Sequence, residues 1–412
     1  MKKEERLANI IGQISDDMLE QAANVDNKRC FDRLLAYKVA WKKWTAIAAC
    51  MALIIGVVAF SLITFGPKTH SKLPILSLDT KGFFTGGMGF EGYMAYDISE
   101  LKNANPWSEE VNVTHLPVFK NVHTYDENYQ VPDADINKMK ACLKEIAQRL
   151  GIDAEQLEIT DDRPDEETIN KITEKLRDTV PEYYYNINRV FIKDKGIEVE
   201  VNGALTAAVK FNPPVSLPNE YNFTYYAPYE DFVSVADYLS NKYKAFINMK
   251  KPKANITGGD YDIYNQQNYS IEFFDENGNI LEQMINYNFN KVTFNCDDDG
   301  NLFGAGVFQP DLSHKIGNYP VITPNEAKRL LSKGNYITTV PEEFSGEEYG
   351  RKIELIYRTN GTEKIFLPYY RIYVEMPSMK RDNGINTYGA FYVPAVNGKY
   401  IENMPIWDGS FN

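Results

Sequence analysis

The stretch YPVITPNEAKRLLSKGNY, residues 319–336, contains the clearest helix start in the sequence. Thr323 and Glu326 form a capping-box pattern, and Pro324 stands at the first helical position, so we expect a helix to begin there. Apolar residues follow at helical spacing, and Gly334 predicts the end of the helix. The segment therefore predicts an amphipathic helix with one face available to cover a sheet.

The residues after this helix have the patterns of short strands. Ile353–Thr359 and Glu363–Phe366 flank Asn360-Gly361, a dipeptide that predicts a type I′ hairpin. Tyr370–Glu375 and Tyr388–Val393 are also rich in β-branched and aromatic residues. We therefore expect residues 311–412 to form one helix packed on a small antiparallel sheet.

The same order of helix and strands recurs earlier in the chain. Helical periodicity predicts helices at about 133–150, 165–178 and 230–247. Alternating or apolar runs predict strands at 196–201, 205–211, 269–274, 279–287, 291–296 and 301–308. We therefore predict an α+β fold of repeated helix-plus-antiparallel-sheet units, because each helix can cover one face of its sheet.

One segment is uniformly apolar. Thr45–Phe65 holds 21 residues without a charge, enough for a helix of about 31 Å. Six Lys or Arg residues precede it within 20 positions and three follow it, which predicts a cytoplasmic N-terminus. A buried core helix and a cleaved signal peptide are the alternatives. The fold class expected from the whole sequence is therefore one transmembrane helix followed by extracytoplasmic α+β units.

Charge divides at this segment. Residues 1–44 hold nine Lys or Arg against seven Asp or Glu, a net charge of +2, whereas residues 66–412 have a net charge of −15. So acidic a surface argues against nucleic acid as a partner. The predicted parts are a cytoplasmic helical stub (1–44), a transmembrane helix (45–65), a Gly/Pro-rich stalk and lead-in (66–132), a first α+β region of one or two units (133–310) and a C-terminal unit (311–412).

Motifs that carry catalysis or metal binding do not emerge from the sequence. The four histidines, His70, His115, His123 and His314, have no metal-ligand spacing, and no nucleophile elbow is present. Asp297–Gly300 lacks the glutamate of a calcium loop and predicts a hairpin turn. We expect no catalytic residue, no cofactor and no bound metal. Cys142 and Cys296 either pair or remain free thiols, and the sequence leaves this open.

Tyrosine is the most conspicuous residue type, with 28 copies. Several tyrosines stand together, at Tyr183, Tyr184, Tyr185, Tyr225, Tyr226, Tyr369 and Tyr370. Such clusters offer rigid amphipathic area for binding a protein or a carbohydrate. They are more typical of strands that pack through aromatic cross-strand pairs. These seven residues are the candidate binding residues.

Residues 319–336, with PYYRIYVEM (368–376) and YGAFYVPAV (388–396), resemble a PepSY/cystatin-like half-unit. The resemblance implies a helix that leans on three or four antiparallel strands, as in single-pass regulators that restrain a cell-wall sensor kinase in Gram-positive bacteria. The segments IGQISDDMLEQAA and WKKWTAIAAC near the N-terminus are similar to membrane anchors of anti-sigma-like proteins from these bacteria. The zinc motif of many anti-sigma domains is missing, so no metal ligand is transferred.

Two functions from different classes follow as expectations. The first is a non-enzymatic, membrane-anchored extracytoplasmic regulator or sensor that acts through protein–protein contacts. The second is a cell-surface module that binds wall polymer or peptide. The predicted localisation is the cell membrane, with a single pass, a cytoplasmic N-terminus and residues 66–412 outside. A hydrolase with an unrecognised site is a third class, without a motif to support it.

Overall fold

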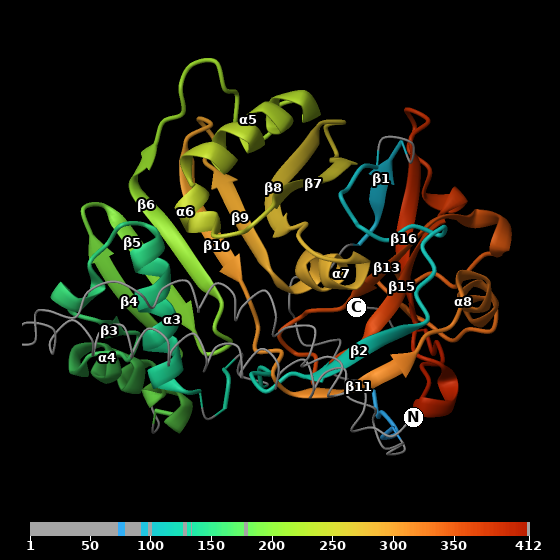
Figure 1. Ribbon diagram of the computed structural model, residues 1–412, viewed down its shortest axis with the longest axis horizontal. Helices are drawn as coiled ribbons and strands as arrows, with labels where there is room; N and C mark the ends of the chain where they lie inside the picture. The colour runs from blue at the N-terminus through green and yellow to red at the C-terminus, as the bar shows by residue number, and fades with distance from the viewer. Residues whose placement is uncertain are drawn as a thin grey trace, which may run out of the picture. The chain divides into compact units, whose positions relative to one another are not determined.

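The computed structural model describes residues 73–78, 92–97, 101–126, 130–132, 134–176 and 180–409 (Figure 1). The chain divides into two units after Lys72, and every described residue belongs to the second unit. These residues form sheets built of many strands, covered by a few helices. The α+β part of the predicted fold class agrees with this architecture.

The transmembrane part of that prediction is corrected. Within the described ranges, no helix is both long and apolar enough to cross a membrane. The longest, α3 (Ile136–Arg149) and α5 (Tyr229–Lys242), have 14 residues each and are amphipathic. A helix of that length spans about 21 Å, short of a hydrocarbon core of about 30 Å. This finding contradicts the single-pass fold class and the membrane localisation; residues 45–65 themselves lie outside the described residues.

The largest element of the fold is an eight-stranded antiparallel sheet. Its strands run in the order β3 (Thr160–Asp161), β4 (Arg189–Asp194), β5 (Ile197–Asn202), β6 (Ala207–Val215), β10 (Leu302–Phe308), β9 (Lys291–Cys296), β8 (Gln267–Asp275) and β7 (Pro252–Tyr261). Helices α3, α5 and α6 (Lys244–Ile247) cover one face of it (Figure 1). The region predicted as one or two units thus shares one continuous sheet.

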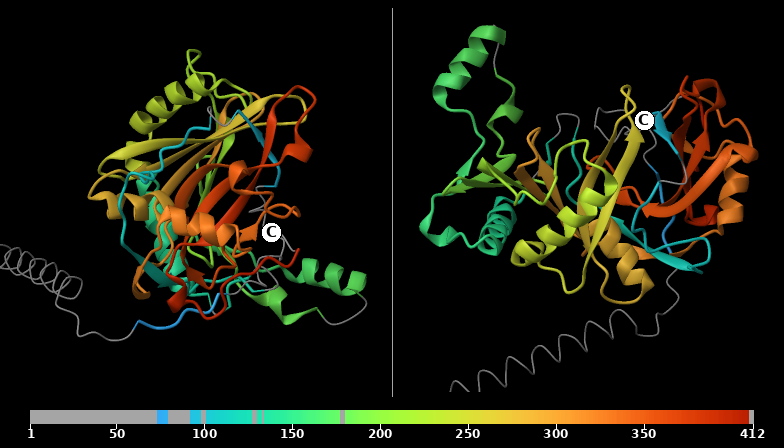
Figure 2. Two further views of the ribbon diagram at one scale, coloured as in Figure 1. Left: turned by 90° about the vertical axis from the view of Figure 1, so that its right-hand side faces the viewer. Right: turned by 90° about the horizontal axis from the view of Figure 1, so that it is seen from above.

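The covering helices arise where the sequence pattern places them. Asp135 caps α3 by accepting hydrogen bonds from the backbone N–H groups of Asn137 and Lys138. The buried face of α3 carries Met139 and Leu143, which join the core of the sheet. The helix predicted at 230–247 is divided at Tyr243 into α5 and α6. Helix α4 (Glu166–Leu176) also forms but stands away from the sheet, with none of its described side chains buried (Figure 2).

A second sheet contains the last strands of the chain. Its order is β1 (Met94–Tyr96), β16 (Asn386–Pro394), β15 (Pro368–Glu375) and β13 (Gly350–Tyr357), with β12 (Ile337–Thr338) also paired to β16. Helix α8 (Pro324–Leu331) packs on it and begins with the predicted capping box of Thr323 and Glu326. Because side chains alternate along β15, Tyr369 enters one core and Tyr370 the other. The sheet is therefore covered on both faces.

One predicted strand is a helix. Residues 279–287 were expected to return as the second strand of a hairpin, but the structure has α7 (Ile280–Phe289) there. Asn279 accepts hydrogen bonds from the N–H groups of Leu281 and Glu282, and the Glu282 side chain accepts from the N–H of Asn279. This reciprocal capping box starts the helix. Buried Met284 and partly buried Leu281 then join the core beneath α8, so the apolar run packs with helical rather than strand spacing.

The hairpin predicted at Asn360-Gly361 is also wrong. β13 pairs with β15, whereas β14 (Ile365–Phe366) pairs with β2 (His115–Lys120) in a three-stranded sheet with β11 (Lys315–Pro320). The Gly361 carbonyl accepts a hydrogen bond of 2.9 Å from the N–H of Tyr125. A side chain at Gly361 would collide with the Tyr125 ring. The glycine lies in a turn that the N–H of Glu363 closes on the Asn360 carbonyl, and it permits a close approach from a distant segment; the turn does not join two paired strands.

Candidate functional site

The structure places the seven predicted tyrosines in three separate elements. Tyr183, Tyr184 and Tyr185 belong to a single 3-10 turn before β4, and Tyr225 and Tyr226 lie in the loop before α5. Tyr369 and Tyr370 are consecutive residues of β15. In the eight-stranded sheet, β4 is near one end, and the β7–β8 hairpin, which contacts Tyr226, is at the other end. The tyrosine clusters therefore do not form one face.

Tyr369 and Tyr370 belong to the core. Each is 2% exposed. The Tyr370 hydroxyl donates a 2.8 Å hydrogen bond to the carbonyl of Ile322, and its ring meets the edge of Trp107 at 5.7 Å. Burial raises the pKa of both hydroxyls. These two residues therefore have no area to offer a partner, and the packing interpretation of the pattern holds for them.

Exposed aromatic and apolar side chains gather at the tip of the β7–β8 hairpin. Ile263 and Tyr264 are 83% and 73% exposed, the largest values among the exposed apolar and aromatic residues there. Tyr225 and Tyr226 are about half exposed, and their rings meet edge to face at 4.9 Å. The Tyr226 hydroxyl donates a 3.0 Å hydrogen bond to Asp262 Oδ2, which joins the loop to the hairpin. We call these four residues, Tyr225, Tyr226, Ile263 and Tyr264, the tip surface.

The backbone under the tip surface is held in place. Asp262 Oδ1 accepts hydrogen bonds from the N–H groups of Tyr264 and Gln266, and the Gln266 bond is the main reason that the pKa of Asp262 is lowered. The Arg381 guanidinium donates to the carbonyls of Tyr261 and Asp262 from the loop after β15. The hairpin is therefore anchored next to its tip while its apolar side chains remain exposed.

The tip surface contains two of the predicted tyrosines and two residues that the sequence analysis missed. Ile263 and Tyr264 stand in GGDYDIYNQQN, between polar turn residues. Turns usually lie at the surface and are rich in polar residues, so a large apolar residue in a turn is not expected to be buried in the core. The position of these two residues was therefore a usable signal of contact with another molecule. What the sequence could not show is that they lie beside Tyr226.

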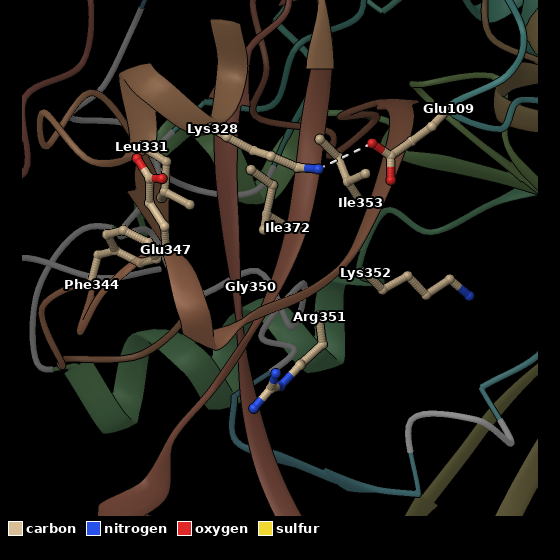
Figure 3. Close-up of a pocket in the computed structure, with 10 residues that line it drawn as sticks. All are labelled: Glu109, Lys328, Leu331, Phe344, Glu347, Gly350, Arg351, Lys352, Ile353 and Ile372. Atoms are coloured by element: carbon tan, nitrogen blue, oxygen red, sulfur yellow. Dashed lines mark hydrogen bonds and ion pairs between the residues drawn. The ribbon is translucent and has the colours of Figure 1, made fainter. Parts of the chain in front are cut away.

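A cavity of about 180 Å³ lies between α8, β13 and the loop before β2 (Figure 3). Its wall includes Lys328, whose Nζ is 3.1 Å from Glu109 Oε2. The other charged side chains of the lining also have intramolecular partners: Arg351 with Glu375, Lys352 with Glu354 and Glu347 with Ser332. Arg351 and Lys352 extend away from the Lys328–Glu109 pair (Figure 3). Because two carboxylates, Glu109 and Glu347, line this cavity together with its cations, it is poorly suited to an anionic ligand.

A buried polar network lies behind this cavity. Glu354 on β13 is 3% exposed, and its Oε2 accepts from Arg371 Nη2 at 2.6 Å. Lys352 Nζ and Asn103 Nδ2 contact Oε1 at 3.1 and 2.6 Å. Burial alone would raise the pKa of Glu354, but Arg371 and Lys352 hold it at about 2. A carboxylate that is so fully paired has a structural role.

Among the described residues, two further kinds of candidate site are metal-binding clusters and reactive thiols. No group of three or more His, Cys, Asp or Glu residues there could hold a metal ion. Asp297 closes the β9–β10 turn by accepting from the N–H groups of Asp299 and Asn301, as predicted. Cys142 and Cys296 are free thiols, and burial raises the pKa of both, which disfavours the reactive thiolate.

His123 is a buried histidine that should make the stability of the fold depend on pH. It is 9% exposed, and its Nε2 has no hydrogen-bond partner among the described residues. Burial lowers its pKa, and Lys138 and His314 add to that effect while Asp311 and Asp135 oppose it. The unfolded chain therefore binds the proton more readily, and we expect the free energy of unfolding to fall as the pH drops below about 6.5.

Urea denaturation at pH 7.5 and 5.5 tests this expectation. The His123→Gln variant should lose part of the wild-type difference between the two pH values, whereas His314→Gln, at an exposed histidine nearby, should keep most of it, because burial is the larger cause of the shift at His123. An unchanged pH difference in His123→Gln would show that other groups cause it.

No protein-family model matches this sequence, and no curated protein matches it significantly. Among solved structures, the chain is similar to an uncharacterized protein from Eubacterium rectale ATCC 33656, with 9% sequence identity and a TM-score of 0.30. The match covers 69% of this chain and 85% of that chain. So low a TM-score carries no argument about fold or function, and the PepSY/cystatin-like resemblance stays a prediction.

Proposed function

We propose that this chain is a non-enzymatic protein that acts through contacts with another protein, and that the tip surface is the contact. The observation that carries the proposal is the exposure of Ile263 and Tyr264 on an anchored hairpin. Large apolar side chains that are exposed together are characteristic of interaction sites, and tyrosine is enriched among residues that dominate binding energy. A pre-formed backbone lowers the entropy lost on binding.

The resemblance to regulators with PepSY/cystatin-like units supports the same class of function. In such a protein the folded domain needs a partner rather than a substrate. The residues of the tip surface are an isoleucine and three tyrosines, without a histidine, carboxylate or thiol, which suits contact better than catalysis.

A double variant, Ile263→Asp with Tyr264→Asp, should lose the partner without losing the fold. Both side chains are largely exposed, so we expect the free energy of unfolding to change by no more than about 0.5 kcal/mol. Two new charges in the centre of an apolar contact should abolish binding. The measurement is cross-linking and affinity capture from the native host with the full chain as bait.

Ile406→Asp is the matched control, because Ile406 is 74% exposed but lies outside the tip surface. Proteins retained by the wild type and by Ile406→Asp but lost by the double variant would support the proposal. It would be contradicted if the double variant retained the same proteins, or if the wild type retained none specifically.

The alternative function, binding of wall polymer or peptide, is favoured by one observation. Tyr183 and Tyr184 stack at 4.7 Å, and neighbouring Tyr185 is 51% exposed. Exposed rings in such a turn can cover the apolar face of a sugar. Retention of the full chain on purified wall material, reduced by Tyr185→Ala but not by the tip variant, would select this function instead.

A further inference from the structure

A second cavity, of about 420 Å³, differs from the one in Figure 3 in its charge. It opens where the C-terminal end of α3, the turn between β4 and β5, strand β6 and the junction of α5 with α6 come together. Helices α3 and α6 contact each other beside it on the covered face of the sheet (Figure 1). The charged residues of its lining are Arg149, Lys195 and Lys242, and none of its lining residues is a carboxylate. In a chain with a net charge of −13, a purely cationic cavity is a local exception.

Arg149 is the central cation. Its side chain is 10% exposed, and its Nη2 donates to Glu145 Oε1 at 2.6 Å and to Gln309 Oε1 at 3.4 Å. Its Nε and Nη1 are buried and find no acceptor in the part of the chain that the structure describes. Leaving buried donors unsatisfied costs free energy, and more for a charged group. These two donors have almost no solvent-accessible surface, so the Arg149 side chain must turn toward the cavity before an anion there can supply the missing acceptors.

The two lysines, Lys195 and Lys242, have only weak intramolecular partners. Lys242 Nζ donates to the Tyr238 hydroxyl at 2.8 Å, a neutral partner. Lys195 Nζ is 3.6 Å from Asp194, and its side chain is 89% exposed. Gly196, with φ of +83°, closes the turn that carries Lys195 so tightly that a Cβ would lie 2.4 Å from the Asn212 carbonyl oxygen. This close contact fixes the backbone of the turn, and therefore the position of the Lys195 Cα.

The floor of the cavity is apolar. Ile197, Phe211 and Phe246 line it between the cations, and Phe211 packs against Tyr243 with 6.2 Å between the ring centroids. Cavities of this size, with apolar walls and a few converging polar groups, are the usual form of small-molecule sites. The lining therefore combines three cations with hydrophobic area.

We propose that this cavity binds a small amphipathic carboxylate. Its negative group lies at Arg149, where the guanidinium fork matches a planar carboxylate, and Lys242 adds to the attraction. Its apolar or aromatic body lies against Phe211, Phe246 and Ile197. The same chemistry is present in a free small acid and in the C-terminal residue of a peptide. The cavity in Figure 3 is a poorer site for an anion, because the carboxylates Glu109 and Glu347 are part of its lining.

Isothermal titration of the purified full chain with 3-phenylpropionate tests the charge requirement. We expect binding that weakens as salt is added, and the neutral 3-phenylpropionamide should bind at least about tenfold more weakly. A tetrapeptide that ends in phenylalanine, with a free or an amidated C-terminus, forms the second arm. Tighter binding of the free peptide than of 3-phenylpropionate would assign the site to peptide termini, and the reverse would assign it to small acids.

Three variants locate the site. Arg149→Gln and Lys242→Gln should each weaken 3-phenylpropionate binding, by about tenfold and by about threefold. Arg351→Gln, an arginine of the other cavity, should bind as the wild type does. If Arg149→Gln does not fold, the affinity of Lys242→Gln for 3-phenylpropionate tests the location of the site. The proposal is overturned if the acid and the amide bind equally, or if Arg149→Gln and Lys242→Gln both bind like the wild type.

Discussion

Replacing Arg371 by methionine should lower the free energy of unfolding by about 3–5 kcal/mol. The guanidinium contacts Glu354 Oε2 through Nη2 at 2.6 Å and through Nε at 3.1 Å. Removing it leaves a 3% exposed carboxylate with Lys352 as its remaining cationic partner. A buried charge that loses its principal partner retains its desolvation penalty without the matching attraction. Urea denaturation at pH 7 measures the loss.

The pH dependence of this variant provides a second check. In the wild type, Glu354 has a folded pKa of about 2, below that of an unfolded glutamate. Its contribution is complete above about pH 4.5 and is lost as the pH falls towards 2. Without Arg371, burial raises the folded pKa of Glu354, so this acid-induced loss should become smaller.

Arg351→Met is the matched control, because Arg351 lies on β13, the strand that pairs with the β15 strand of Arg371. Arg351 contacts Glu375 at 2.6 Å across the same pair of strands, but its side chain is 43% exposed. An exposed pair of this kind contributes less than about 1 kcal/mol. Equal losses in Arg371→Met and Arg351→Met would show that burial of Glu354 does not determine the cost.

Tyr370→Ala should also destabilise the fold by about 3–5 kcal/mol. The change removes a 2% exposed ring that packs on Trp107, and it leaves the buried carbonyl of Ile322 without its donor. Tyr225→Ala is the comparison, because Tyr225 is 49% exposed and should cost no more than about 0.5 kcal/mol. Thermal and urea denaturation of both variants test the assignment. Similar losses in the two variants would contradict the division between core and surface tyrosines.

Local signals in the sequence predicted most of the helices and several turns. The capping box at Thr323 and Glu326 formed as expected, and α3 follows the apolar periodicity of residues 133–150. The turn at Asp297 also formed, because its side chain bonds to backbone groups two and four residues later. Each of these features depends on contacts within a few residues, so a short stretch of sequence contains all the groups involved.

The errors arose where a local pattern admits two structures. The apolar run from Ile280 to Tyr287 fits a strand as well as a helix, and the capping box of Asn279 and Glu282 decided for the helix. Asn360-Gly361 is a hairpin signal, but strands β13 and β14 found partners that are far away in the sequence. The apolar segment 45–65 is the basis of the contradicted membrane prediction and lies outside the described residues.

By itself, the sequence determined the α+β class, the helices α3, α5 and α8, and the abundance of tyrosine. Only the tertiary structure decided which tyrosines reach the surface, because Tyr225 and Tyr370 look alike until their neighbours are known. It also joined Tyr226 to Asp262 and Arg381 to the same hairpin, across 36 and 119 residues. Side chains so far apart meet only when strands pair and pack, and burial, charge compensation and cavities all arise from those distant contacts.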